Sequence, residues 1–276
     1  MLKSERLLQH PQGRFLLYAD RALAHTQTVS DFGLEWTELD PYRDLESLSY
    51  SHLFARFLLP QRFFEGKAVL DLGCGNGRLA DQLIAHTRSY VGVELSEAIF
   101  AFDVAAPHAQ KVTLVRASME DVPLHDGVFD VVLCWGVLHH VRDPDAGFRE
   151  LRRLVKPGGV ILLFIYPDAY APRENLNRLF RHVPDDALRD FCAWYFKTIR
   201  QWGEADLHLA SSICNALSAG LKLDSRWELL QMFDGLGPAY HHLLEGRVGS
   251  AFPAPWRVQR RHFGCYYIER APEPHK

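Results

Sequence analysis

The sequence has few cysteines, and none of them has the spacing of a metal or redox site. Five cysteines are scattered through 276 residues without a C-x-x-C pair, the spacing typical of zinc ligands and redox dithiols. We therefore expect reduced thiols, a cytoplasmic location and no bound metal. The five are Cys74, Cys134, Cys192, Cys214 and Cys265.

Long apolar runs are also missing. No window approaches the roughly 18 apolar residues of a membrane span. The chain begins Met-Leu-Lys-Ser-Glu-Arg, without the apolar stretch of a signal peptide. We expect a soluble, unprocessed protein with no membrane partner.

A strong net charge is absent as well. The formal net charge is -3 and the sequence pI is about 6.5, whereas nucleic-acid binders usually present a basic field or stripe. Arg257, Arg260 and Arg261 lie near the C-terminus but match no RNA module, and with His262 they are typical of a solvated strand face. We expect no nucleic-acid partner, and the oligomeric state stays open.

The middle third of the chain alternates short apolar runs with segments of helical spacing. This alternation predicts right-handed crossovers and a parallel sheet with helices on both faces, a doubly wound Rossmann-like α/β core over residues 67–166. Strands are expected at 67–72, 89–93, 111–116, 130–134 and 160–166, and helices at 77–86, 96–105 and 145–155.

Two flanking segments do not follow this alternation of strands and helices. Residues 1–66 are predicted to be mainly helical, with scattered aromatic residues, and residues 167–235 form a second helical segment inserted after the fifth strand. We expect both to cover the carboxyl edge of the sheet, where ligands of open α/β folds bind. Residues 236–276 return to the core, with strands at 256–263 and 265–269 around a turn at Gly264. No flexible linker separates these parts, so 1–276 is expected to be a single domain.

A glycine-rich turn follows the first expected strand. Asp71 precedes Gly73, Gly75 and Gly77, and glycines there let the backbone turn tightly and approach a ligand. Glu94 ends the second strand some 20 residues later, the place of an acidic group that accepts hydrogen bonds from both ribose hydroxyls. These features predict a nucleotide-containing cofactor, but they do not separate S-adenosylmethionine from NAD.

Four segments carry a resemblance that distinguishes S-adenosylmethionine from NAD as the cofactor. VLDLGCGNGRLA (69–80), VGVELS (91–96), ASMEDVPLHDGVFDVVLCWGVLHHV (117–141) and LRRLVKPGGVILLFIY (151–166) occur in the order and spacing of class I S-adenosylmethionine-dependent methyltransferases. The chain resembles this family almost continuously over residues 67–166. The resemblance implies a seven-stranded sheet whose last strand is antiparallel.

The resemblance also implies roles for individual positions. Glu94 would hold the ribose, Asp71 would orient the loop and the sulfonium end, and Leu95 would cover one face of the adenine. Ser118 and Met119 correspond to adenine-edge positions, although an aspartate is common at position 118, so a hydroxyl would replace a carboxylate there. The cofactor-binding positions are Asp71, Gly73, Cys74, Gly75, Gly77, Glu94, Leu95, Ser118, Met119 and Cys134.

The loop after the fourth strand is where the family places the donor methyl close to the acceptor. His139 and His140 lie in it, and a histidine can act as a general base near neutral pH; alternatively, the two histidines orient the loop. Cys134 is interpreted as a packed small residue rather than a nucleophile. The expected substrate-binding residues are Trp36, Tyr42, Tyr50, Trp135, His139, Tyr166 and Tyr170.

The expected reaction is transfer of a methyl group to a small molecule by in-line displacement, in which the protein contributes alignment and desolvation. Residues 31–36 and 233–242 resemble flanking segments of small-molecule members of the family. One alternative keeps the fold but transfers or cyclises the aminocarboxypropyl arm. The others are a non-catalytic S-adenosylmethionine-binding module and an NAD-dependent oxidoreductase.

Overall fold

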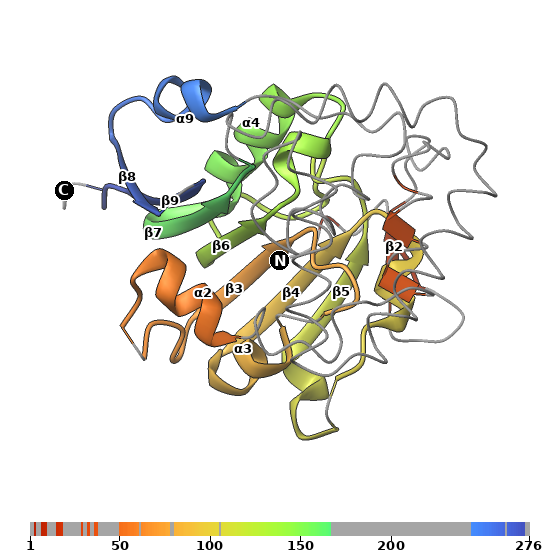
Figure 1. The fold of residues 1–276 in the computed structure, drawn as a ribbon. Helices are drawn as coiled ribbons and strands as arrows, with labels where there is room; N and C mark the ends of the chain where they lie inside the picture. Colours follow the sequence, from red (N-terminus) through yellow and green to blue (C-terminus); the bar gives the residue numbers. More distant parts are fainter. Residues whose placement is uncertain are drawn as a thin grey trace, which may run out of the picture.

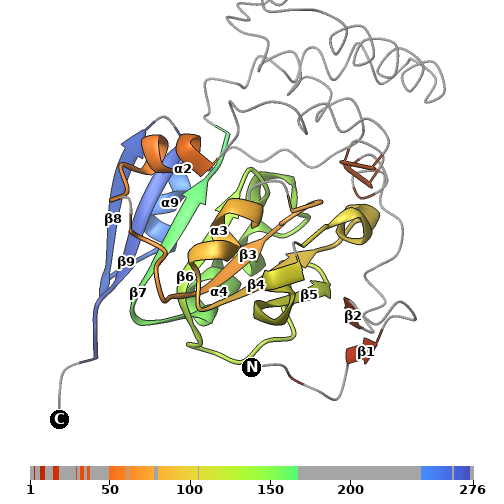
Figure 2. The ribbon, with the colours of Figure 1, turned by 90° about the horizontal axis from the view of Figure 1, so that it is seen from below.

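The computed structural model shows a mixed nine-stranded sheet with helices on both faces (Figures 1 and 2). Its strand order is β1-β2-β5-β4-β3-β6-β7-β9-β8. The structure describes residues 3, 7–9, 15–18, 29, 32–33, 36–37, 50–60, 62–77, 80–104, 106–166, 244–262 and 264–273.

Five parallel strands form the centre of the sheet and confirm the predicted Rossmann-like core. Their side chains are mostly apolar, and the first of them is buried along its whole length, as expected for strands covered on both faces. The five are β3 (Ala68–Leu72), β4 (Ser89–Glu94), β5 (Val112–Arg116), β6 (Phe129–Trp135) and β7 (Val155–Phe164).

Alternate residues of these strands enter two separate apolar cores. Leu70 and Val132 face the core that contains α4 (Pro144–Leu154) and α9 (Glu245–Ala251). Val69 and Val131 face the other core, which contains α2 (Tyr50–Phe57) and α3 (Ala80–His86). This alternation follows from the two-residue period of a strand, and it confirms helices on both faces of the sheet.

The C-terminal strands also confirm the prediction. β8 (Trp256–His262) and β9 (Cys265–Arg270) pair antiparallel, and β9 runs antiparallel to β7. Gly264 between them has a φ of 70°, a conformation that suits glycine in a tight turn.

The strand count and the N-terminal segment differ from the prediction. β1 (Leu7–Gln9) and β2 (Phe15–Tyr18) extend the expected seven strands to nine, so these residues are strands rather than helices. The run Phe-Leu-Leu-Tyr pairs parallel with β5 and covers an edge that would otherwise leave backbone groups unpaired.

Two element boundaries were also wrong. Ser96 caps a helix as expected, but the helix is the short 3-10 helix η5 (Glu97–Ala101) instead of an α-helix that reaches residue 105. β7 begins directly after α4, five residues before the predicted strand at 160. Val155 pairs with Phe129 and Val160 pairs with Val131, so a register shift accommodates the intervening Pro-Gly-Gly within the strand.

The expected helical insertion at 167–235, and Tyr42 and Tyr170 with it, lie outside the described residues. The division of the chain into a core and two lids therefore stays a prediction. Within the described ranges, no helix is both long enough and apolar enough to cross a membrane.

Candidate functional site

The site lies at the carboxyl edge of the sheet, where four neighbouring parallel strands end. β3 leads into the glycine loop at 73–77, and β4 ends at Glu94. β5 leads into the loop at 117–128, and β6 leads into the short 3-10 helix η7 (Leu138–His140). The parallel direction of these strands brings segments that lie far apart in the sequence to one edge.

The three glycines of the loop are needed for different reasons. All have positive φ values, 79° at Gly73, 55° at Gly75 and 83° at Gly77, in the left-handed region that side chains disfavour. A Cβ atom at Gly73 would overlap the Val137 side chain, and one at Gly77 would overlap the Phe102 ring. No larger side chain fits at these two positions, because protein atoms fill the adjoining space.

Gly75 is different, because the described residues leave the space beside it open. Among the described residues, the only atom that a Cβ at this position would meet within 4 Å is Cγ of Trp36, at 4.0 Å. Glycine is therefore required by the backbone conformation but not by protein packing. Open space beside a bare backbone is what a ligand lying against this loop needs.

Glu94 holds two segments of this edge together. Its Oε2 atom accepts a hydrogen bond from the Gly75 amide at 3.1 Å, and its Oε1 atom accepts one from the Ser96 amide at 2.7 Å. A carboxylate has about four acceptor sites, so the described residues leave each oxygen with capacity for one further donor. The geometry suits a group that receives two ligand hydroxyls.

Asp71 is buried beneath the loop and bonded to a tyrosine. The Tyr90 hydroxyl donates to Asp71 Oδ2 at 2.7 Å, and the two side chains are 0% and 3% exposed, respectively. Burial raises the pKa of Asp71 to about 7, while the Tyr90 hydrogen bond opposes the rise and the nearby Glu94 charge adds to it. Asp71 therefore titrates near neutral pH, and a cation placed beside it would favour its charged form.

The two cysteines of the candidate site are buried thiols. Burial raises the pKa of Cys134 to about 12 and that of Cys74 well above its usual value. Neither is a thiolate at neutral pH, which fits the interpretation of Cys134 as a packed small residue rather than a nucleophile. Cys74 contributes its backbone: its amide donates to the Val93 carbonyl at 3.1 Å.

The loop after β5 carries Ser118 and Met119, which are 6% and 5% exposed. It begins beside Glu94, because the Ala117 amide donates to the Glu94 carbonyl at 3.1 Å. Leu95 is half-buried on the adjoining segment. The structure thus brings the ribose and adenine positions implied by the resemblance to the ends of two paired strands.

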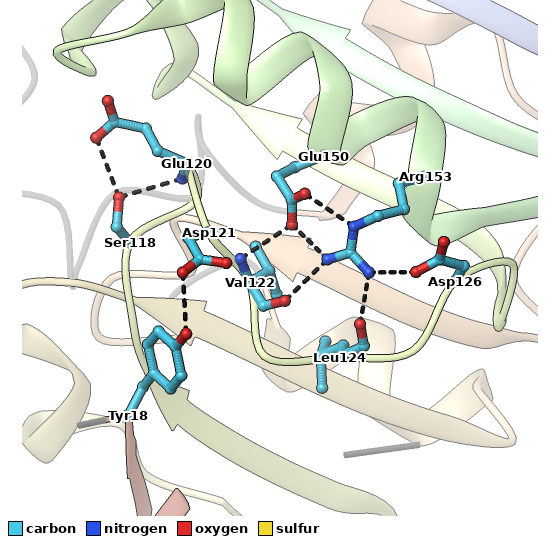
Figure 3. A network of polar contacts seen from close by, with 9 residues as sticks. All are labelled: Tyr18, Ser118, Glu120, Asp121, Val122, Leu124, Asp126, Glu150 and Arg153. Carbon is cyan, nitrogen blue, oxygen red and sulfur yellow. Dashed lines mark hydrogen bonds and ion pairs between the residues drawn. The ribbon is translucent and has the colours of Figure 1, made fainter. Parts of the chain in front are cut away.

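A polar network fastens the rest of this loop to α4 and to β2 (Figure 3). Glu150 accepts the Val122 amide at 2.9 Å and forms an ion pair with Arg153. Arg153 also donates to the Val122 and Leu124 carbonyls and pairs with Asp126. On the other side, the Tyr18 hydroxyl donates to Asp121 at 2.9 Å. Contacts from both directions therefore fix the path of the backbone beyond Met119.

His139 and His140 lie in an aromatic cluster at the end of β6. His139 is 0% exposed and packs on Tyr166, with ring centroids 3.9 Å apart, and its Nδ1 accepts the Tyr166 amide at 3.4 Å. His140 contacts Phe32 edge-on at 5.1 Å between centroids. Phe32 belongs to the N-terminal segment, so this contact joins that segment to the loop after β6.

Other N-terminal residues also reach the site. The Asn76 side chain donates to the Trp36 carbonyl at 3.1 Å, next to the glycine loop. The expected substrate residue Trp36 therefore lies at the loop, whereas Trp135 packs between Phe57 and Phe164 at the end of β6. Tyr50 begins α2, and its side chain is outside the described part.

Sequence reasoning missed several residues that support the site. Tyr90 holds Asp71, Val137 and Phe102 fill the space beside two glycines, and Glu120 binds Ser118. Tyr90 and Phe102 carry no signal, because they read as ordinary apolar core residues. Glu120 had one available signal: it lies two residues after Ser118, a position where an aspartate is common in the family that the sequence resembles.

Residues 70–163 match the model of a protein family described as a methyltransferase domain. The matched segment begins in β3 and ends in β7, so it contains the glycine loop, Glu94, the Ser118 loop and both histidines. These are the parts of the chain that form the carboxyl edge described above.

The chain is also similar to ubiquinone biosynthesis O-methyltransferases. It is 35% identical over 148 residues to the protein from Coxiella burnetii (strain RSA 331 / Henzerling II), over 48% of this chain and 62% of that protein. It is 41% identical over 101 residues to the protein from Aromatoleum aromaticum (strain DSM 19018 / LMG 30748 / EbN1), over 35% and 42%. The chain thus spans less than two thirds of these curated relatives.

Among solved structures, the chain is 28% identical to an S-adenosylmethionine-dependent methyltransferase from Mesorhizobium loti. The similarity covers 48% of this chain and 57% of that chain, with a TM-score of 0.39.

Proposed function

We propose that this chain, whose residues 70–163 match a methyltransferase domain, is a class I enzyme that transfers the methyl group of S-adenosylmethionine to a small-molecule acceptor. One observation carries the proposal: the space that the described residues leave open beside Gly75 lies next to a carboxylate, Glu94, that bonds the same loop and keeps acceptor capacity. A ligand with a ribose and an amino-acid arm fits both features.

The residues present fit S-adenosylmethionine. Glu94 would receive the ribose hydroxyls, and the backbone of Gly73, Cys74 and Gly75 would lie against the amino-acid arm. Asp71 beneath the loop would offer negative charge to the sulfonium end. Leu95 and Met119 would contact the adenine. Bound there, S-adenosylmethionine would supply a methyl group already activated by its positive sulfur.

The protein's own part in such a reaction is alignment, exclusion of water and acceptance of a proton. We propose His140 as the proton acceptor for substrates that carry a proton, because it is the more accessible histidine, 7% against 0% exposed, and contacts Phe32. His139 supports it at 4.1 Å between ring centroids. In neutral His139 the Tyr166 amide occupies Nδ1, which directs the ring proton to Nε2 and suits a positioning role.

The acceptor is proposed to be small because residues of the N-terminal segment lie across the site edge. Phe32 and Trp36 contact the loops after β6 and β3, and the segment at 167–235 would complete the cover. Hydrogen exchange measures this directly: cofactor and acceptor together should protect residues 1–50 and 167–235. Protection confined to the glycine loop would contradict the lid. Because the relatives named above are O-methyltransferases, hydroxyl-bearing small molecules are the first acceptors to test.

Isothermal titration of the purified chain with three ligands tests the cofactor. S-adenosylmethionine and S-adenosylhomocysteine should bind, and NAD should not. Tight binding of NAD without binding of S-adenosylmethionine would overturn the proposal.

Product analysis then separates the remaining alternatives. Methyl transfer leaves S-adenosylhomocysteine, whereas transfer or cyclisation of the aminocarboxypropyl arm leaves methylthioadenosine. Binding without any turnover across a panel of acceptors would favour the non-catalytic module.

A further inference from the structure

The order of the strands fixes where the purine of the cofactor would lie. The glycine loop follows β3 and Glu94 ends β4, so a ligand that lies on the loop and reaches Glu94 with its ribose extends toward β5, the next strand in the sheet. Ser118 follows the end of β5, and the neighbouring Ala117 amide is bonded to the Glu94 carbonyl. This placement rests on the proposed function.

A serine at this position poses a recognition problem. The exocyclic amino group of adenine is a hydrogen-bond donor, so it requires an acceptor. A hydroxyl can donate or accept, and a free serine would therefore tolerate a 6-oxo purine as well as a 6-amino purine. A carboxylate would not, because it only accepts.

Glu120 resolves this ambiguity. Its Oε2 atom accepts the Ser118 hydroxyl proton at 3.1 Å, and its own amide donates to Ser118 Oγ at 3.1 Å (Figure 3). The single hydroxyl proton is thus committed to Glu120, and the oxygen keeps one lone pair. In this arrangement, Ser118 can act toward a ligand only as an acceptor.

The position of Glu120 is itself fixed. Its Oε1 atom accepts the amide of Asp143 at 2.6 Å, and Asp143 caps the start of α4 by accepting the Asp145 and Ala146 amides. The carboxylate therefore spans the loops after β5 and β6. It cannot turn away from Ser118 without losing the Asp143 bond.

We propose that Glu120 is a positioning residue that makes Ser118 an obligate acceptor for the exocyclic amino group of the cofactor's purine. The pair Ser118–Glu120 takes the place of an aspartate, which is common at position 118 in the family that the sequence resembles. Glu120 acts through the serine, so its effect is on the choice of purine.

Two thioether ligands test this choice. S-adenosylhomocysteine carries a 6-amino purine, and S-inosylhomocysteine carries a 6-oxo purine on the same scaffold. Isothermal titration of the full chain should give the wild type a preference for the adenosine ligand of about 10-fold or more, since a 6-oxo purine would lose the hydrogen bond to Ser118 and set two acceptors against each other. In Glu120→Gln the amide can donate to Ser118 and release the hydroxyl proton, so the preference should fall to about 1- to 3-fold.

A rescue variant and a matched control keep the test specific. Ser118→Asp combined with Glu120→Gln supplies a direct carboxylate acceptor without like-charge repulsion, and the preference for the adenosine ligand should return. Asp121→Asn disturbs the same loop through its Tyr18 bond but leaves the Ser118 contact in place. It should change both affinities in parallel.

The outcomes separate this inference from the proposed function. If the wild type binds neither thioether, the proposed function fails and this inference fails with it. If the wild type binds S-adenosylhomocysteine with the expected preference and Glu120→Gln keeps the same ratio, then Glu120 is only a structural clamp and the inference alone is wrong.

Discussion

The carboxylates at the two edges of the central sheet have different kinds of partner. At the amino edge, Asp130 accepts the Ala68 amide at 2.8 Å and forms ion pairs with Arg88 and Lys156. At the carboxyl edge, the hydrogen bonds that Asp71, Glu94 and Glu120 accept from described residues come from hydroxyls and backbone amides. Within the described part of the chain, none of these three carboxylates has an ion-pair partner.

The pKa values follow this difference. Burial opposes ionisation of Asp130, but hydrogen bonds from Lys156 and the Ala68 amide outweigh it and lower the pKa. Burial raises the pKa of Asp71 to about 7, because only the hydrogen bond from the Tyr90 hydroxyl opposes this rise. The amino-edge carboxylate of Asp130 is thus paired with cations, whereas the carboxyl-edge carboxylates keep acceptor capacity, which the proposed binding of a ligand with a cation and hydrogen-bond donors requires.

The largest expected effect comes from a side chain placed on the glycine loop. Gly75→Val should lower the affinity for S-adenosylmethionine by more than about 100-fold, because a branched side chain would fill the space open to the ligand. Isothermal titration measures the loss.

Gly66→Val is the matched control at the amino edge. Gly66 also has a positive φ, 68°, and no atom of the described residues lies within 4 Å of its Cβ position. The two variants should therefore lose similar thermal stability, but Gly66→Val should bind the cofactor normally. Equal losses of affinity would show that backbone strain, and not ligand contact, explains Gly75.

Exchanging one carboxylate at each edge sharpens the comparison further. Glu94→Gln should weaken S-adenosylmethionine binding by roughly 10- to 150-fold, since a charge-assisted hydrogen bond is worth about 1.5 to 3 kcal/mol. Asp130→Asn leaves Lys156 and Arg88 without their charge partner, so it should lower the unfolding temperature and leave the affinity unchanged. Unaltered cofactor affinity in a folded Glu94→Gln protein would refute the ribose assignment.

The central strands could be predicted from the sequence, but the edge strands and the residues that support the site could not. Periodicity and glycine placement predicted the five central strands, because each strand is specified by its own local residues. β1 and β2 were missed, because short strands at a sheet edge depend on a partner far away in sequence. The same limit applies to the site. Glu94 stands out at a strand end, whereas Tyr90 is recognised only when its pairing with Asp71 is seen.

A smaller effect concerns the pH dependence of binding. The folded pKa of Asp71 is about 7, above its ordinary value of 3.8. Between these values the folded state holds a proton that the unfolded chain has lost, so the contribution of Asp71 to stability falls as the pH rises toward 7 and is constant above it. A cationic ligand prefers the charged carboxylate, so its affinity should rise through about pH 7, by up to about tenfold per unit.

The measurement is the dissociation constant of S-adenosylmethionine from about pH 5.5 to about pH 8.5, which brackets the midpoint. Asp71→Asn should remove this rise, and S-adenosylhomocysteine, whose sulfur is neutral, should show a smaller rise in the wild type. Parallel pH profiles for wild type and Asp71→Asn would show that Asp71 does not sense the ligand charge.

The smallest expected effect comes from a substitution that removes a single hydroxyl from the carboxyl edge. Tyr90→Phe keeps the ring packed beside Phe102, 6.0 Å away between centroids, and deletes only the donor to Asp71. Because that hydrogen bond lowers the pKa of Asp71, its loss should move the midpoint of the pH profile upward by about half a unit to one unit, the equivalent of roughly 1 kcal/mol. The affinity for S-adenosylmethionine should then fall about 2- to 5-fold at pH 7 and recover above about pH 8, where Asp71 is charged in either protein. Tyr266→Phe is the matched control. Tyr266 lies in β9, away from Asp71, and its hydroxyl donates to Glu245, so this variant should leave the midpoint of the pH profile unchanged. A uniform loss of affinity at every pH in Tyr90→Phe would mean that Tyr90 supports only the packing of the loop and does not set the charge of Asp71.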